Sequence, residues 1–152
     1  MVSKTSCAVV GAGCLVLALT LGSLGSLGST SKAAEDATSV WQGVYTKAQA
    51  ARGQATYFAA CVSCHGAQLQ GDTDAPELAG NGFLRKWTGL SVGALFAFTE
   101  SQMPVGRPRG LGAQGYAEVI AHILATNGFP DGQQELPAGG SVLDKIMIDK
   151  KK

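Results

Sequence analysis

Residues 61–65 of this chain read Cys61-Val62-Ser63-Cys64-His65, a C-x-x-C-H motif. Two thiols separated by two residues lie about one helical turn apart, so both can add to the vinyl groups of a porphyrin while the adjacent imidazole faces the iron. The motif therefore predicts one haem c, attached through Cys61 and Cys64. His65 is the expected proximal iron ligand, with its other ring N–H held by a second acceptor.

Two other uses of these residues agree less well with the sequence. A thioredoxin-like dithiol requires a βαβ context, which the Gly-rich and helix-forming surroundings do not provide. A structural zinc site needs four ligands, and beyond residue 33 the cysteines and histidines are limited to Cys61, Cys64, His65 and His122. Zinc would therefore consume all of them.

Residues 1–33 are predicted to be a secretory signal peptide. Lys4 precedes an apolar run from Cys7 to Leu24, and Ser31-Lys32-Ala33 resembles a small-x-small cleavage site. Cleavage after Ala33 predicts a periplasmic protein. A retained membrane anchor is the alternative, because the apolar run approaches the length of a spanning helix. Lipid attachment at Cys14 is disfavoured, since the residues before it lack the expected aliphatic side chain.

Cleavage would change both the charge and the cysteine count. The full chain has 12 Lys and Arg against 11 Asp and Glu, and losing Lys4 and Lys32 leaves 10 against 11, a net charge of −1. This balance argues against nucleic-acid binding and against membrane binding other than through an uncleaved N-terminus. Cys7 and Cys14 would also be lost, so no disulfide is expected.

The hydrophobic pattern of the remaining chain predicts an all-α fold of four to five short helices around the haem. A flexible leader (34–39), a haem-binding domain (40–136) and a tail (137–152) that either lies on the domain or stays loose are expected. Helices are predicted over 40–61 (with a start at Gly53 as the alternative), 83–87, 91–99 with Ser91 as N-cap, and 115–126. Residues 66–82 and 103–110 are predicted to be loops.

The second axial ligand decides between electron transfer and ligand chemistry. Met103, in a Pro/Gly-rich loop 38 positions after His65, is the best candidate. A methionine thioether favours Fe(II) and raises the reduction potential. Core packing is the alternative role for Met103. Met147 is interpreted as an ordinary apolar contact, and His122 as a boundary residue rather than a ligand.

The region from Val40 to Leu136 resembles the class I cytochrome c family, which has a cytochrome c fold. The resemblance is carried by four motifs in order: Gly53-x-x-x-Tyr57 before the attachment run, Ala75-Pro76-Glu77-Leu78-Ala79-Gly80, Met103-Pro104, and Tyr116-x-x-Val119-Ile120-Ala121-x-Ile123-Leu124. The endings Asn127-Gly128-Phe129-Pro130 and Glu135-Leu136 are similar to bacterial members, including cytochromes that accompany periplasmic quinoprotein dehydrogenases.

This resemblance implies roles for particular residues. The helix of Gly53 would cross the helix of Tyr116 closely, and the Pro76 carbonyl would accept a hydrogen bond from His65. Leu78 would line the haem pocket, and Trp87 would lie near a propionate. His122 stands where the family often has an aromatic residue.

The expected function is that of an exported monohaem cytochrome c, an electron carrier rather than an enzyme. Its expected partners are redox proteins, such as a quinoprotein dehydrogenase as donor and a terminal oxidase as acceptor, and it would act as a monomer or as a subunit of a redox complex. Four cations, Arg85, Lys86, Arg107 and Arg109, are expected to frame the haem edge, and the alternative is that they are solvated loop charges. The alternatives are a haem enzyme or gas sensor with an open distal site, and a dedicated subunit docked through residues 139–152.

Overall fold

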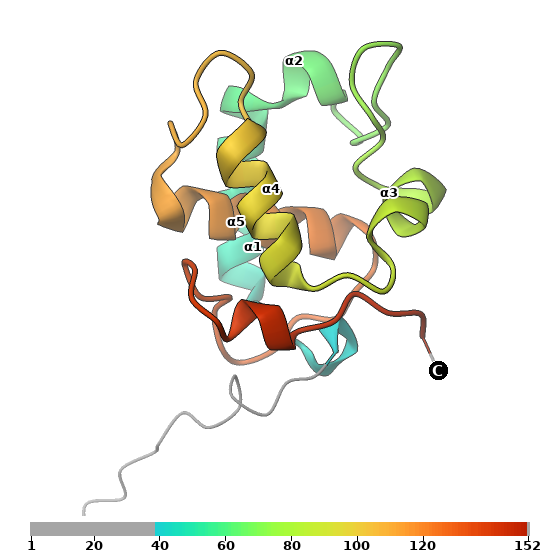
Figure 1. Ribbon diagram of the computed structural model, residues 1–152, viewed down its shortest axis with the longest axis vertical. Helices are drawn as coiled ribbons and strands as arrows, with labels where there is room; N and C mark the ends of the chain where they lie inside the picture. The colour runs from blue at the N-terminus through green and yellow to red at the C-terminus, as the bar shows by residue number, and fades with distance from the viewer. Residues whose placement is uncertain (1–38, 152) are drawn as a thin grey trace, which may run out of the picture.

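The computed structural model describes residues 39–151, which form five α-helices and two short 3-10 helices (Figure 1). In chain order these are η1 (Val40–Gln42), α1 (Lys47–Ala60), α2 (Val62–His65), α3 (Gly80–Trp87), α4 (Val92–Gln102), α5 (Gly112–Thr126) and η2 (Leu143–Lys145). Within the described residues β-structure is limited to isolated bridges at Met147. The predicted all-α fold with four to five short helices is therefore confirmed.

The N-terminal predictions concern residues that the structure does not describe. The signal peptide (1–33), its cleavage site and the leader as far as residue 38 all lie outside the described part of the chain. Between residues 39 and 151, no helix combines the length and the apolar content needed to cross a bilayer.

Helices α1 and α5 cross at the centre of the fold (Figure 1). The Thr46 hydroxyl caps α1 by accepting a hydrogen bond from the N–H of Gln49 (3.1 Å). Gly53 lies inside α1, where a Cβ would overlap the backbone carbonyl of Glu118 on α5. The close crossing implied by the family resemblance is confirmed, and the alternative of a helix start at Gly53 is wrong.

The first predicted helix is divided into two. Gly43 adopts a φ of +72°, a left-handed conformation that ends η1, and α1 begins only at Lys47. Position 43 also requires glycine for space, since a Cβ there would lie 2.9 Å from the carbonyl oxygen of Asp131. The apolar period from Val40 onward continued through this break, so periodicity alone did not reveal it.

The later helices match their predicted positions with shifted ends. Ser91 caps α4 as predicted, its hydroxyl accepting from the N–H of Ala94 (3.1 Å), but α4 continues to Gln102. Helix α3 begins at Gly80, whose N–H donates to the side chain of Asn127 (2.9 Å). That contact joins segments distant in sequence, so a local pattern could not indicate this start.

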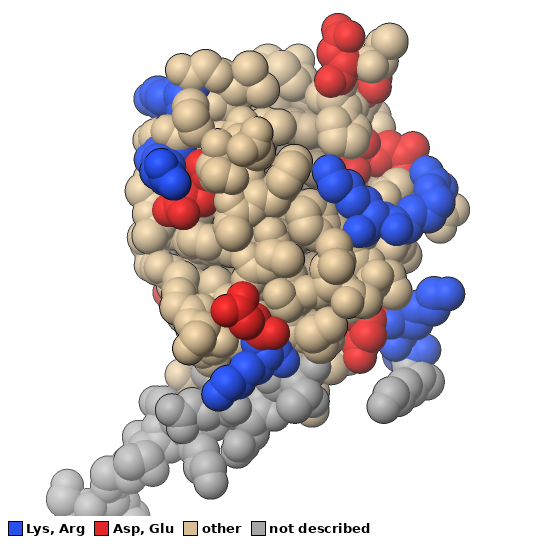
Figure 2. Space-filling view, viewed as in Figure 1, with Lys and Arg blue, Asp and Glu red and all other residues tan. Residues whose placement is uncertain are grey.

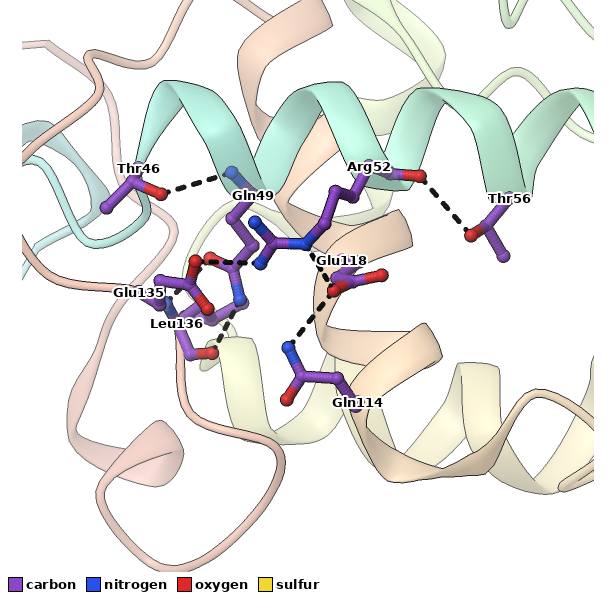
Figure 3. Close-up of polar contacts among 8 residues, drawn as sticks. All are labelled: Thr46, Gln49, Arg52, Thr56, Gln114, Glu118, Glu135 and Leu136. Atoms are coloured by element: carbon purple, nitrogen blue, oxygen red, sulfur yellow. Dashed lines mark hydrogen bonds and ion pairs between the residues drawn. The ribbon is translucent and has the colours of Figure 1, made fainter.

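Polar contacts tie α1 to α5 and to the segment after α5 (Figure 3). Arg52 on α1 pairs with Glu118 on α5 and with Glu135, each at 2.7 Å. The fully buried Gln49 donates to the carbonyl of Leu136 (2.8 Å) and accepts from its N–H (2.7 Å). The paired amide leaves no buried polar atom of Gln49 unsatisfied, so it fixes the chain after α5 against the core.

The C-terminal tail lies on the domain. Its side chains Leu143, Ile146 and Ile148 are buried. The carbonyl of Ile146 accepts from the N–H of Val92 (2.8 Å), and the carbonyl of Met147 accepts from the N–H of Val40 (3.0 Å). The apolar residues that a free docking segment would offer to a partner are thus already used to join the start of the domain to the start of α4.

Candidate haem site

The C-x-x-C-H motif begins at Cys61, the residue between α1 and α2, and includes all of α2. Cys61 joins the two helices, because its N–H donates to the carbonyl of Tyr57 (2.8 Å) and its own carbonyl accepts from the N–H of His65 (3.0 Å). Cys61 is half-buried, Cys64 is exposed, and both are free thiols. Burial, together with the neighbouring Cys64, raises the pKa of Cys61 to about 11. Redox-active dithiols show the opposite shift, so the thioredoxin-like alternative gains no support.

The imidazole of His65 is oriented by a backbone carbonyl. His65 is buried, and its Nδ1 lies 2.9 Å from the carbonyl oxygen of Pro76. A carbonyl can only accept, so Nδ1 carries the proton and Nε2 keeps a free lone pair. A histidine held in this way presents Nε2 to a metal. The hydrogen bond implied by the resemblance is present, whereas iron ligation itself stays a prediction.

The Pro76 carbonyl is placed by a loop that folds back on itself between α2 and α3. The N–H of Leu78 donates to the carbonyl of Leu69, and the N–H of Asp72 donates to that of Ala75, both at 2.8 Å. Leu69 is buried with a φ of +59°, a conformation that costs a non-glycine residue about 1 kcal/mol. Such strain is typical of a segment whose geometry serves a site.

Met103 directly follows α4 and is held by its backbone at both ends. Its N–H donates to the carbonyl of Thr99 (2.9 Å), and its carbonyl accepts from the hydroxyl of Tyr116 on α5 (2.6 Å). Its side chain is half-buried. The loop after it has no regular structure, as predicted, and the N–H of Arg109 returns to the carbonyl of Glu100 (2.9 Å).

Two tyrosine hydroxyls have positioning roles that the sequence reasoning missed. The Tyr57 hydroxyl donates to the carbonyl of Gly66 (2.6 Å), the residue after His65, just as Tyr116 donates to Met103. Burial, with the nearby Cys61, raises the pKa of Tyr57 to about 12, so this phenol remains a donor. A buried tyrosine requires a partner for its hydroxyl, and that requirement was the available signal.

Asn127 is a third positioning residue that the sequence reasoning treated only as a helix end. Its amide donates to the carbonyl of Leu78 (2.9 Å) and accepts from the N–H of Gly80. Leu78, the predicted pocket residue, is half-buried between these contacts. Asn127 therefore attaches the end of the loop that carries Pro76 to the C-terminus of α5.

Trp87 ends α3 within an aromatic cluster. Its ring is 5.7 Å from that of Phe98 on α4, and the Lys86 ammonium lies 4.3 Å from the Phe98 ring centre and 5.3 Å from that of Trp87. Trp87 is 5% exposed. A propionate contact for Trp87 stays a prediction.

His122 lies at the crossing of α1 and α5. Its ring centre is 5.4 Å from that of Tyr57, and its Nε2 is buried without a hydrogen-bond partner among the described residues. The side chain is half-buried, in agreement with the interpretation as a boundary residue. Burial lowers the pKa of His122.

The residues of this site fit a covalently bound haem. Two free thiols flank one turn of helix, and the imidazole beside them has one nitrogen occupied and the other available. Half-buried apolar side chains that the core does not fully cover, among them Cys61, Val62, Leu78 and Leu84, offer surface to a macrocycle. Fold and site together define a c-type cytochrome, with haem c held through Cys61 and Cys64.

Comparison with known protein families shows to which family of c-type cytochromes the chain belongs. The family model described as "Cytochrome C oxidase, cbb3-type, subunit III" matches residues 48–123, half of the 152-residue chain. The chain belongs to this family, and it is a class I monohaem cytochrome c, a haem-binding electron-transfer protein. Comparisons with curated proteins and with solved structures each gave no match. The matched span contains Cys61, Cys64, His65 and Met103.

Proposed function

We propose that this protein is an exported carrier of single electrons whose haem iron is ligated by His65 and Met103. The observation that carries the proposal is the paired anchoring of the two ligand segments. The Tyr57 hydroxyl holds the chain beside His65, and the Tyr116 hydroxyl holds the carbonyl of Met103. Both tyrosines come from the crossing helices α1 and α5, so the rigid centre of the fold positions both segments.

The haem c would supply the exchange of one electron between Fe(II) and Fe(III). The protein residues set the conditions for that exchange. His65 keeps its proton on Nδ1 through the hydrogen bond to Pro76, so Nε2 remains a neutral ligand. The uncharged Met103 thioether favours the reduced state and raises the potential. Since both segments are anchored by backbone contacts, neither has to move when the charge of the iron changes.

The ligation is tested by the visible spectrum of the mature protein. Oxidised wild-type protein is expected to show the sulfur-to-iron charge-transfer band, and Met103→Ala is expected to lose it and to bind carbon monoxide readily when reduced. The reason is that alanine leaves the sixth iron position without a strong ligand. The reduction potential should fall, because the thioether no longer stabilises Fe(II).

Met147→Ala is the matched control, since it removes the other methionine of the described residues. It should keep the band, because Met147 belongs to the tail that joins residue 40 and α4. If wild-type protein lacks the band and binds carbon monoxide, the distal site is open, and a haem enzyme or gas sensor replaces the carrier.

Partners and location form the second part of the proposal. The signal-peptide sequence supports a periplasmic location, and the bacterial C-terminal motifs support a quinoprotein dehydrogenase as donor. An oxidase as acceptor is supported by the description of the matched family. These partners are redox proteins that need only a surface near the haem edge, so no substrate pocket is required.

The loop after Met103 offers such a surface. Val105 is 82% exposed, the highest value among the exposed large apolar side chains, and Arg107 and Arg109 are exposed beside it. Figure 2 shows basic side chains over this loop on one side and over α3 on the other, with a largely uncharged face between them. Exposed apolar area bordered by cations suits an acidic partner surface.

A further inference from the structure

The position of the Pro76 carbonyl depends on a glycine that lies between it and the backbone of His65. The N–H of Gly71 donates to the carbonyl of His65 (2.8 Å). On its other side, a Cβ at Gly71 would lie 2.7 Å from the carbonyl carbon of Pro76, 2.7 Å from the nitrogen of Glu77 and 2.5 Å from the oxygen of Ala75.

All three atoms next to this missing Cβ are backbone atoms, and one of them belongs to the carbonyl that accepts from His65. No flexible side chain could move aside to make room. Real Cβ atoms do not approach backbone this closely, so a side chain at position 71 must displace the segment from Ala75 to Glu77. The φ of +67° at Gly71 also favours glycine.

We propose that Gly71 is a positioning residue that sets the contact between the His65 imidazole and the Pro76 carbonyl, and thereby the reduction potential of the haem. Gly71 donates a hydrogen bond to the backbone of His65 and packs against the Pro76 peptide. It therefore fixes the distance between His65 Nδ1, the donor, and the Pro76 carbonyl, the acceptor. The inference rests on the proposed role of His65 as an iron ligand.

The strength of this hydrogen bond affects the iron through the imidazole. When Nδ1–H donates strongly, negative charge accumulates on the ring and the imidazole becomes a more basic ligand. A more basic ligand stabilises Fe(III) relative to Fe(II) and lowers the potential. A displaced Pro76 carbonyl weakens the bond, so the potential should rise.

Gly71→Ala tests this inference, and Gly112→Ala is its matched control. Gly112 has a φ of +68°, so alanine meets nearly the same backbone strain there, but nothing lies within 4 Å of a Cβ at that position. We expect Gly71→Ala to shift the potential upward and Gly112→Ala to leave it near the wild-type value. Exchange of the His65 ring N–H, followed by NMR, should be about tenfold faster in Gly71→Ala only, the factor for one lost hydrogen bond.

Equal potentials and equal exchange rates in the two variants would overturn the inference. The charge-transfer band separates this failure from failure of the proposed function, since a protein that keeps the band has retained both ligands. If Gly71→Ala yields no folded holoprotein, the reduction potential of Asp72→Ala tests the inference instead. The Asp72 carboxylate accepts from the N–H groups of Asp74 and Ala75, each at 2.8 Å, so its loss frees the same segment.

Asp74→Ala removes the same charge from the same loop and serves as the control for Asp72→Ala. A potential that rises further in Asp72→Ala than in Asp74→Ala supports the inference, and equal shifts overturn it.

Discussion

Among the described residues, two buried side-chain polar atoms have no hydrogen-bond partner, Thr88 Oγ1 and His122 Nε2. Gln49 uses both amide atoms on Leu136, and Tyr57 and Tyr116 donate to backbone carbonyls. His122 instead keeps Nε2 buried and unpaired against the Tyr57 ring. An unsatisfied buried polar atom costs about 1–3 kcal/mol, so His122 weakens the crossing of α1 and α5.

His122 should also make stability depend on pH. Burial lowers the pKa of His122 in the folded protein below the ordinary value of about 6.5. The unfolded chain therefore binds this proton more readily, and stability is lost as the pH falls from about 6.5 toward the folded pKa. We expect the free energy of unfolding of His122→Phe to depend less on pH across this range, as measured by denaturant unfolding.

The two proteins differ only at position 122, so the difference between their stabilities at each pH isolates the contribution of His122. The informative range is about pH 5 to pH 7.5, around the ordinary pKa of histidine. If the free energies of unfolding of wild type and His122→Phe change in parallel across this range, the imidazole of His122 is hydrated in solution and the prediction is wrong.

The crossing of α1 and α5 is the central contact between elements. It depends on the missing side chain of Gly53, where the two backbones approach too closely for a Cβ. A glycine within a helix costs about 1 kcal/mol relative to alanine, so helix propensity alone would favour alanine at this position. The close approach outweighs that preference.

Gly53→Ala should therefore destabilise the protein by about 2 kcal/mol or more, because overpacking against rigid backbone exceeds the gain in helix propensity. Gln54→Ala is the control, since Gln54 is the next residue of α1 and its side chain is exposed. Its free energy of unfolding should change by no more than about 0.5 kcal/mol. A Gly53→Ala protein as stable as Gln54→Ala would mean that the helices separate without cost.

For the whole molecule, the distribution of charge matters more than its sum. The full chain has a formal net charge of +1, yet Arg107 and Arg109 lie together on the exposed loop that follows Met103. Charges near the point of electron transfer raise the rate of encounter with oppositely charged partners, and salt screens this effect.

Reversing the charge of both arginines should change the rate of electron transfer to small oxidants in a direction that depends on the charge of the oxidant. At low salt, Arg107→Glu with Arg109→Glu should slow oxidation by anionic ferricyanide about tenfold and should not slow oxidation by a cationic cobalt complex. The matched control is Lys145→Glu with Lys150→Glu, which changes the net charge equally on the tail at the other end of the molecule (Figure 1). Equal effects in the two double mutants would show that only net charge matters and would remove the docking surface.

Local sequence determined the chemistry and much of the secondary structure. The spacing from Cys61 to His65 specifies haem attachment, and Ser91 and the apolar stripe of α5 place two helices, because covalent spacing, capping and periodicity are properties of neighbouring residues. The proximity of Pro76 to His65 was implied by family resemblance and could not be derived from those local rules.

The way in which separate segments meet is a property of the whole fold. The amide of Asn127 and the buried tail from Leu143 to Ile148 find partners far away in sequence, and the hydroxyls of Tyr57 and Tyr116 find theirs beyond their own helices. The physical reason is that a buried donor or apolar side chain demands a partner without specifying which one. The C-x-x-C-H motif therefore specifies the cofactor, whereas long-range packing selects the backbone carbonyls that orient the residues around it.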